Sequence, residues 1–142
     1  MSLSTTTRDN ILFLNVGDTR LLDEARIETL EKEVYAAIDA STEERVVMDF
    51  SMVEFMSSSM LGKLVKIHKK CQGFKVKLKL CSVSKDILEV FKITRLDKLF
   101  DIEADAEAAR KAFNKRHLRL IASSAKSTEL LGQTGERLII ER

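Results

Sequence analysis

The chain has 142 residues, of which 44% are hydrophobic and 32% charged, and its net charge is +2. This length suits one domain with a core that needs no disulfides, and the composition is that of a globular protein. No apolar run reaches the roughly 20 residues that cross a membrane, and the polar first ten residues lack the apolar segment of a signal peptide. We therefore expect no membrane span and a cytoplasmic location.

The first predicted strand covers residues 11–16, which are mostly apolar and end at a turn signal, Gly17–Thr19. The polar lead-in before this strand leaves room for an early antiparallel strand. A helix is predicted next, because apolar residues recur at intervals of three and four, and Asp23 precedes them as the candidate N-cap. The apolar stripe of this helix consists of Ile27, Leu30, Val34, Ala37 and Ile38.

The second predicted strand, residues 45–50, is almost continuously apolar, which is typical of a strand buried on both faces in the middle of a sheet. Three serines, Ser57–Ser59, follow it after a short connection. They precede a second helical pattern from Leu61 to Cys71. Gly73 comes directly after that pattern, at a position suited to a left-handed cap. The three hydroxyls therefore lie where a strand is followed by a helix.

Residues 74–80 alternate strictly between apolar residues and lysine, which predicts a strand with one core face and one solvated lysine face. A short helix is predicted over residues 85–91 and a final strand over residues 99–102. A last helix begins near Asp101 or Asp105.

The predicted order βαβαβαβα indicates an α/β fold with a mainly parallel, mixed sheet and about four helices. We place this single domain at residues 8–113. Residues 114–142 fit the alternation less well, and we expect them to form an extension that is mobile or packs on a neighbour.

Motifs of catalysis and cofactor binding do not occur in the sequence: there is no GxxxxGK[ST], GxGxxG or GxSxG pattern. Cys71 and Cys81 lie in apolar patterns at a spacing that suits neither a metal nor a redox pair, so we interpret both as buried. The histidines, His68 and His117, lack the cluster that a metal site requires. We interpret Asp49, at the end of a strand, as a loop-ordering carboxylate. We predict that the protein is not an enzyme and has no cofactor or metal.

Seven lysines and no acidic residue occur between residues 63 and 79. A patch that binds nucleic acid or phosphate is one interpretation. Lysines that alternate along a strand or fall on one side of a helix are also typical of a solvated surface. We favour the solvated surface and expect no direct nucleic-acid partner.

The serine run has a structural and a functional interpretation. Ser57 can accept a hydrogen bond from a free amide of the first helical turn, so capping explains one serine but not three. A phosphate on Ser58 would lie at the positive end of the helix dipole, where the fold tolerates it. It would add about −1.5 to −2 charges to the surface that a partner meets. The run therefore predicts a phosphorylation switch.

The stretch from Asp49 to Gly62, DFSMVEFMSSSMLG, resembles the signature of STAS domains, and most closely that of bacterial anti-sigma-factor antagonists. Their pattern is an apolar strand, Asp-(Leu/Phe)-Ser, a short loop and Asp-Ser-Ser/Thr-Gly-Leu-Gly. The resemblance spans about residues 10–113. It implies a module that binds an anti-sigma factor acting as a serine kinase, is released when that kinase phosphorylates Ser58, and is restored by a phosphatase.

Two positions depart from the signature, because Ser57 replaces its Asp and Met60 replaces its Gly. Ser57 and Ser59 therefore remain alternative phosphoacceptors. Met60 adds a flexible apolar side chain that either anchors a partner or fills a local gap. We expect partner-binding residues at Asp23, Ser57, Ser59, Met60 and Lys63, and a homodimer is a further option. The alternative function is a STAS scaffold subunit of a stress-signalling assembly, or an accessory of a membrane transporter.

Overall fold

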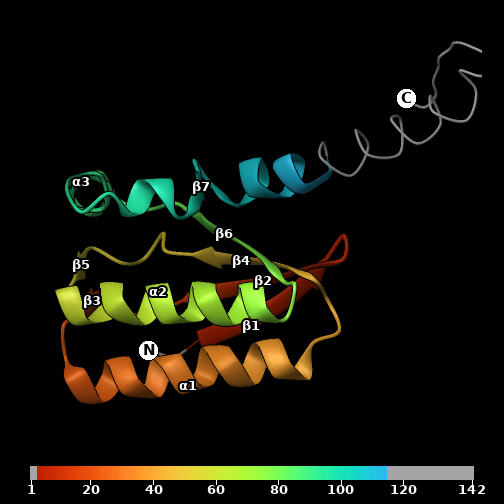
Figure 1. Ribbon diagram of the computed structural model, residues 1–142, viewed down its shortest axis with the longest axis horizontal. Helices are drawn as coiled ribbons and strands as arrows, with labels where there is room; N and C mark the ends of the chain where they lie inside the picture. The colour runs from red at the N-terminus through yellow and green to blue at the C-terminus, as the bar shows by residue number, and fades with distance from the viewer. Residues whose placement is uncertain (1–2, 115–142) are drawn as a thin grey trace, which may run out of the picture. The chain divides into compact units, whose positions relative to one another are not determined.

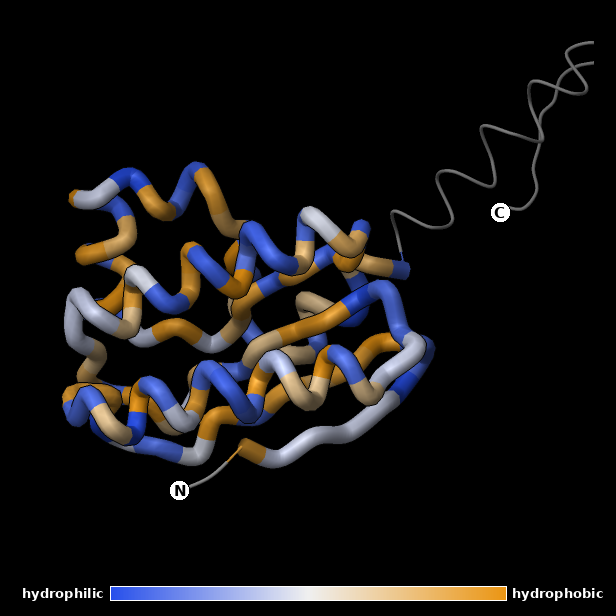
Figure 2. Tube along the Cα trace, turned by 60° about the horizontal axis from the view of Figure 1, so that its bottom comes forward, coloured by the Kyte–Doolittle hydropathy of each residue, from blue (hydrophilic) through white to orange (hydrophobic). Residues whose placement is uncertain are grey.

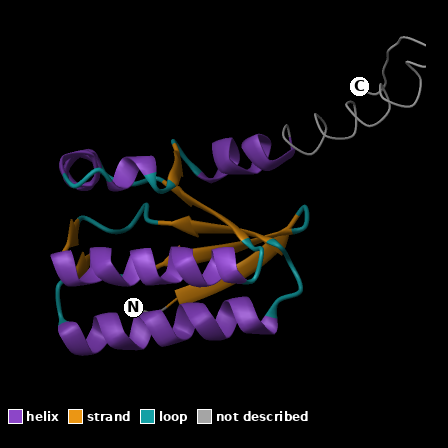
Figure 3. Ribbon diagram, viewed as in Figure 1, coloured by secondary structure: helices purple, strands orange, loops and turns teal. Residues whose placement is uncertain are grey.

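The computed structural model describes residues 3–114 and contains the predicted mixed sheet (Figures 1 and 3). Five strands form it in the order β1-β2-β4-β6-β7, and the last four of these run parallel to one another. β1 pairs antiparallel with β2, so the lead-in does form an early strand. The bounds are β1 Leu3–Arg8, β2 Ile11–Val16, β4 Arg45–Asp49, β6 Lys77–Cys81 and β7 Asp101–Glu103.

Three helices connect the parallel strands, which confirms the predicted alternation: α1 (Glu24–Ala40), α2 (Ser58–Gly73) and α3 (Lys85–Ile93). A short 3-10 helix, η1 (Leu96–Lys98), precedes β7. A further helical stretch over residues 106–114 begins after Asp105, whose Oδ1 accepts from the amide of Ala108 at 2.8 Å. None of the described helices is long and apolar enough to span a membrane.

One compact unit ends at Ala109 and contains the whole sheet, including the strand at residues 3–8 that lies ahead of the expected start of the domain. The expected extension lies outside the described residues from position 115 onward.

The largest hydrophobic cluster lies on one face of the sheet. Each crossover moves from one parallel strand to its neighbour, always in the same direction across the sheet. Because such crossovers are right-handed, all three helices lie on the same side of the sheet. A continuous cluster of buried residues joins strands and helices there. Its members include Leu12, Leu14, Val46, Met48, Leu78 and Leu80 from the strands and Ile27, Leu30, Val34, Leu64, Ile67, Ile87 and Phe91 from the helices.

The predicted solvated lysine face of β6 is wrong at its centre. Lys79 is 2% exposed, and its Nζ lies 3.2 Å from Oε2 of Glu103 and 3.6 Å from Oδ2 of Asp101. The reason is the position of β6 between β4 and β7, where the next strand supplies carboxylates for the lysine. Phe74, the first residue of the predicted strand, instead lies in the preceding turn and is 63% exposed.

The predicted left-handed cap at Gly73 is also wrong. Helix α2 includes Gly73, and the left-handed residue of this turn is Lys75, with a φ of 59°. The amides of Phe74 and Val76 both donate to the carbonyl of Cys71, at 3.2 and 2.8 Å. Backbone amides of the turn thus bind a carbonyl at the end of the helix, and the left-handed residue comes two positions later than the sequence pattern indicated.

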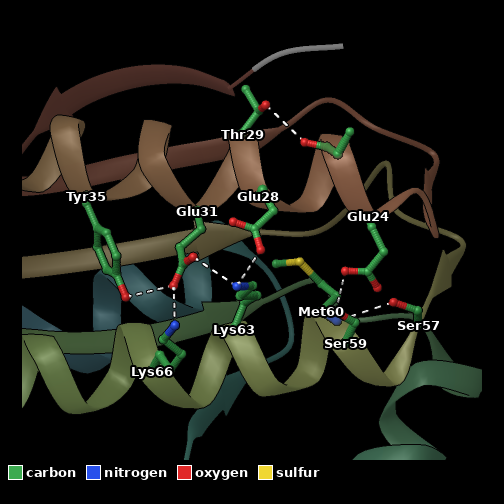
Figure 4. A network of polar contacts seen from close by, with 11 residues as sticks. Glu24, Glu28, Thr29, Glu31, Tyr35, Ser57, Ser59, Met60, Lys63 and Lys66 are labelled. Carbon is green, nitrogen blue, oxygen red and sulfur yellow. Dashed lines mark hydrogen bonds and ion pairs between the residues drawn. The ribbon is translucent and has the colours of Figure 1, made fainter.

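A buried carboxylate joins α1 to α2 (Figure 4). Glu31 is 6% exposed and accepts a hydrogen bond from the Tyr35 hydroxyl at 3.0 Å. Its two carboxylate oxygens face the ammonium groups of Lys63 at 3.3 Å and Lys66 at 3.6 Å. Lys63 also donates to Glu28 at 3.0 Å. The network holds α2, the helix that begins at the serine run, in position against α1.

The network also shifts two pKa values. Burial alone would raise the pKa of Glu31, but the hydrogen bonds from Tyr35 and Lys63 and the charges of Lys63 and Lys66 outweigh it, so the pKa lies below its ordinary value. Burial and the bond to Glu31 raise the pKa of Tyr35 to about 12. Since the pKa of Glu31 is lower in the folded chain, its contribution to stability is present above the unfolded pKa and is lost as the pH falls through the folded one.

We expect Glu31→Gln to lower the free energy of unfolding by about 1–3 kcal/mol at pH 7, because two lysines lose their buried partner. Urea denaturation measures this loss. The difference from wild type should shrink as the pH is lowered into the range where Glu31 becomes protonated. Glu28→Gln is the matched control, since its side chain is 53% exposed and its ion pair contributes below about 1 kcal/mol. Equal losses for the two variants would contradict the role of burial.

Lys79→Ala should destabilise the fold by about 2–4 kcal/mol, because it removes both the ion pairs and the packing of a buried stem. Lys79→Met keeps most of the stem volume and should cost less than half as much. Thermal and urea unfolding of the two variants compare these losses. Equal losses for the two variants would mean that the ion pairs rather than the packing dominate at this position.

Candidate functional site

Ser57 is the N-cap of α2, as predicted. Its backbone is extended, and its Oγ accepts a hydrogen bond from the amide of Met60 at 3.3 Å. Its carbonyl accepts from the amide of Leu61 at 3.2 Å. Ser57 therefore satisfies the open first turn of the helix with its side chain and its backbone.

The other two serines differ in what their hydroxyls do. The Oγ of Ser59 donates to Oε1 of Glu24 at 3.1 Å, across to the first turn of α1 (Figure 4). Ser58 is exposed, and among residues 3–114 its hydroxyl makes no hydrogen bond. No acidic residue lies in the first turn of α2. Ser58 is thus the serine whose hydroxyl is open to an incoming group, at the positive end of a helix of 16 residues.

A two-stranded parallel sheet positions the serine run. It pairs β3 (Arg20–Leu21) with β5 (Phe55–Met56). The amide of Ser57 extends the pairing by donating to the carbonyl of Leu21 at 3.0 Å, and Glu54 donates to the carbonyl of Thr19 at 2.8 Å. These bonds hold the loop before α2 against the loop before α1, so the two helix starts lie at one end of the molecule (Figure 1).

Apolar side chains are exposed in these same two loops. Leu22 is 43% exposed, Met52 58% and Phe55 48%, and the guanidinium of Arg20 lies 4.8 Å from the centre of the Phe55 ring. Together with Ser58 we call Leu22, Met52 and Phe55 the serine surface. Sequence reasoning missed these three residues because only the pairing of β3 with β5 brings their loops together.

The structure places Asp23 at the same end and confirms it as the N-cap of α1, where its Oδ2 accepts from the amide of Arg26 at 2.9 Å. Lys63 is less available than expected, since its side chain is 15% exposed and its ammonium is paired with Glu28 and Glu31. Glu24, the partner of Ser59, was not predicted.

The expectation that Met60 anchors a partner at the surface is wrong. Met60 is fully buried and belongs to the core cluster together with Leu61 and Leu64. Three residues after the N-cap, the helix has turned this position toward the sheet, so the side chain fills the interior.

Residues considered for chemistry have structural roles. Asp49 orders its loop, because its Oδ1 accepts from the amide of Ser51 at 2.8 Å. Burial raises the pKa of Cys71 to about 11 and that of Cys81 to about 12, so both are protonated thiols in the core. His68 packs its ring on Phe100 at 5.2 Å between centres. Within residues 3–114 no group of three potential metal ligands comes together.

Comparison with known proteins agrees with this geometry. Residues 2–109 match the family model of the STAS domain. BtrV of Bordetella bronchiseptica, named as an anti-sigma factor antagonist, is 31% identical over 93 residues, which are 66% of this chain and 79% of BtrV. A STAS domain protein from Planctomyces limnophilus, described as an anti-sigma-factor antagonist, has a TM-score of 0.69 at 25% identity, over 79% of this chain and 98% of its own.

A more distant structure shares the fold alone. SpoIIAA, a cell fate determinant of Bacillus solved in its phosphorylated form, is 16% identical, with a TM-score of 0.59 over 78% of this chain and 99% of its own. The family match extends through the sheet, α1, α2, α3 and the serine run. From the sheet order, the serine-capped helix and this match, the chain belongs to the STAS domain family.

Proposed function

We propose that this protein is an anti-sigma-factor antagonist that binds an anti-sigma factor with serine kinase activity and is released when Ser58 is phosphorylated. The observation that carries the proposal is the exposed Ser58 hydroxyl at the start of α2, together with exposed apolar side chains in the paired loops before α1 and α2. The relationship to BtrV and to the Planctomyces protein supports it.

Contacts within the serine run favour Ser58 as the acceptor over its two neighbours. Phosphorylation of Ser57 would disturb the cap bond to the amide of Met60. A phosphate on Ser59 would lie beside the carboxylate of Glu24, where like charges repel. A phosphate on Ser58 breaks neither contact and meets the partial positive charge of the helix start. The fold therefore stays intact while the charge of the surface changes.

The serine surface explains how one phosphate releases a partner. A partner that covers Leu22, Met52 and Phe55 would bury apolar area and exclude water around Ser58. A dianion at the centre of that contact must be desolvated or meet like charge, which costs several kcal/mol. A cost of ~4 kcal/mol corresponds to roughly a thousandfold loss of affinity.

The kinase and a phosphatase supply the chemistry of this cycle, so the proposal requires no catalytic group, cofactor or metal of this chain. It places the protein in the cytoplasm with its partners. A scaffold subunit, in contrast, would not depend on a modified Ser58.

Incubation with the cognate kinase and ATP should add one phosphate, located on Ser58 by mass spectrometry of peptides. Ser58→Ala should abolish the modification, because the open hydroxyl is gone. Ser59→Ala is the matched control and should be phosphorylated at the wild-type level. A phosphate found on Ser57 or Ser59 in the wild-type chain would contradict the assignment of the acceptor.

Ser58→Asp should weaken binding to the unmodified kinase partner by at least about thirtyfold, since it places a negative charge on the serine surface. Ser58→Ala should bind within about threefold of wild type. Phe55→Ala should lose roughly tenfold, because it removes apolar contact area without adding charge. Isothermal titration calorimetry measures all three. Unchanged binding by both Ser58→Asp and Phe55→Ala would place the interface elsewhere on the domain.

A further inference from the structure

Within residues 3–114, strand β1 forms one edge of the sheet and has a neighbour only on its β2 side (Figure 2). In Figure 2 it is the pale tube along the border of the molecule, outside the described helices. Its six residues, Leu3–Arg8, are exposed except for the half-buried Leu3. An edge strand leaves a row of backbone donors and acceptors without sheet partners, which is a template for a further strand.

The two edges of the sheet differ in how well they are protected against such pairing. β7 has three residues and carries Asp101 and Glu103, so it is a short and charged edge. β1 is twice as long, and residues 3–7 include neither a charged residue nor proline. Three of them are threonines, which favour extended backbone. Only β1 therefore lacks the devices that commonly block edge-to-edge pairing.

The hairpin geometry shows which backbone groups point outward. β1 and β2 are joined by Asp9 and Asn10, whose φ values of 54° and 63° are those of a two-residue type I′ turn. In such a hairpin the pair that closes the turn, Arg8 with Ile11, exchanges both hydrogen bonds, and hydrogen-bonded pairs then alternate along the ladder. Ser4, Thr6 and Arg8 consequently face β2, whereas the amides and carbonyls of Leu3, Thr5 and Thr7 point away from the sheet.

We propose that β1 pairs antiparallel with β1 of a second copy of this chain, centred on Thr5, and joins the two sheets into one. Antiparallel self-pairing follows a two-fold axis, which makes the same surface complementary to itself. Centring on Thr5 places Thr5 opposite Thr5 of the second copy, and Leu3 opposite Thr7. All outward groups are then used, giving about six hydrogen bonds between the copies. A register centred on Thr6 uses only two of the three outward residues of each strand.

Space for the added strand exists on the helical side of the sheet. A hollow of about 360 Å³ lies beside the strand, and the side chains of Thr5 and Thr7 line it together with Ala37 and Ala40 at the end of α1. Ser41, Thr42, Glu43 and Leu12 complete its wall. A hollow next to an open edge accommodates the alternate side chains of an added strand. Self-pairing brings no like charges together along residues 3–7, and the Thr5-centred register matches every outward backbone group of one copy with one of the other, so we take a second copy as the occupant.

Sedimentation equilibrium of the full chain tests the proposal. Wild type should show a monomer–dimer equilibrium, and Thr5→Pro should weaken dimerisation at least about tenfold, because it deletes the two central donors. The outward amide of Thr5 takes no part in the β1–β2 ladder, so circular dichroism and the melting temperature should stay close to wild type. Thr5→Val keeps the donor and the branched shape, and should dimerise like wild type. A wild type that stays monomeric, or equal dimerisation of Thr5→Pro and Thr5→Val, overturns the proposal.

Oxidative cross-linking tests the register. Thr5→Cys places two thiols across the axis with Cα atoms about 5.5 Å apart, within the range of a disulfide. The native thiols of Cys71 and Cys81 are buried and contribute little background. We expect disulfide-linked dimers from Thr5→Cys and none from Thr7→Cys, which faces Leu3. Cross-linking of Thr7→Cys in preference to Thr5→Cys, or of neither, overturns the Thr5-centred pairing.

Discussion

The parallel pairing of β4 with β2 on one side and β6 on the other is the constraint on which the rest of the structure depends. It leaves β4 without an open edge and requires a helical crossover before and after it. Because both crossovers run in the same direction, α1 and α2 lie on one face with their first turns at the carboxyl ends of the strands. The serine run follows β4 in the chain and therefore lies at the carboxyl ends of the strands.

Polar contacts between α1 and α2 determine which side chains near the helix starts are engaged and which remain exposed. Glu31 is stabilised as a carboxylate by Tyr35, Lys63 and Lys66, and Ser59 reaches Glu24 one turn from the helix start. These contacts engage Lys63, the lysine nearest the serines, and the hydroxyl of Ser59. The Ser58 hydroxyl makes no such contact, so a phosphate proposed there would alter the surface charge without disturbing a contact that supports the fold.

The domain offers two surfaces of different chemistry. The serine surface combines an open hydroxyl with Leu22, Met52 and Phe55, which suits a partner that is displaced by negative charge. The edge of β1 offers backbone groups and uncharged threonines, which suits self-pairing. β1 contributes no residue to the serine surface. A dimer through β1 would accordingly present two copies of the serine surface.

The sequence by itself determined the alternation of strands and helices and the caps at Asp23 and Ser57, because a cap depends on backbone groups only three residues away. It also indicated the serine run as a candidate site. Only the tertiary structure decided that Met60 is core, that Lys79 is buried between acidic neighbours, and that Phe55 joins the serine surface. Each of these depends on which strand lies next to which. Contacts between residues distant in sequence determine that pairing, and the local periodicity of the sequence carries no information about them.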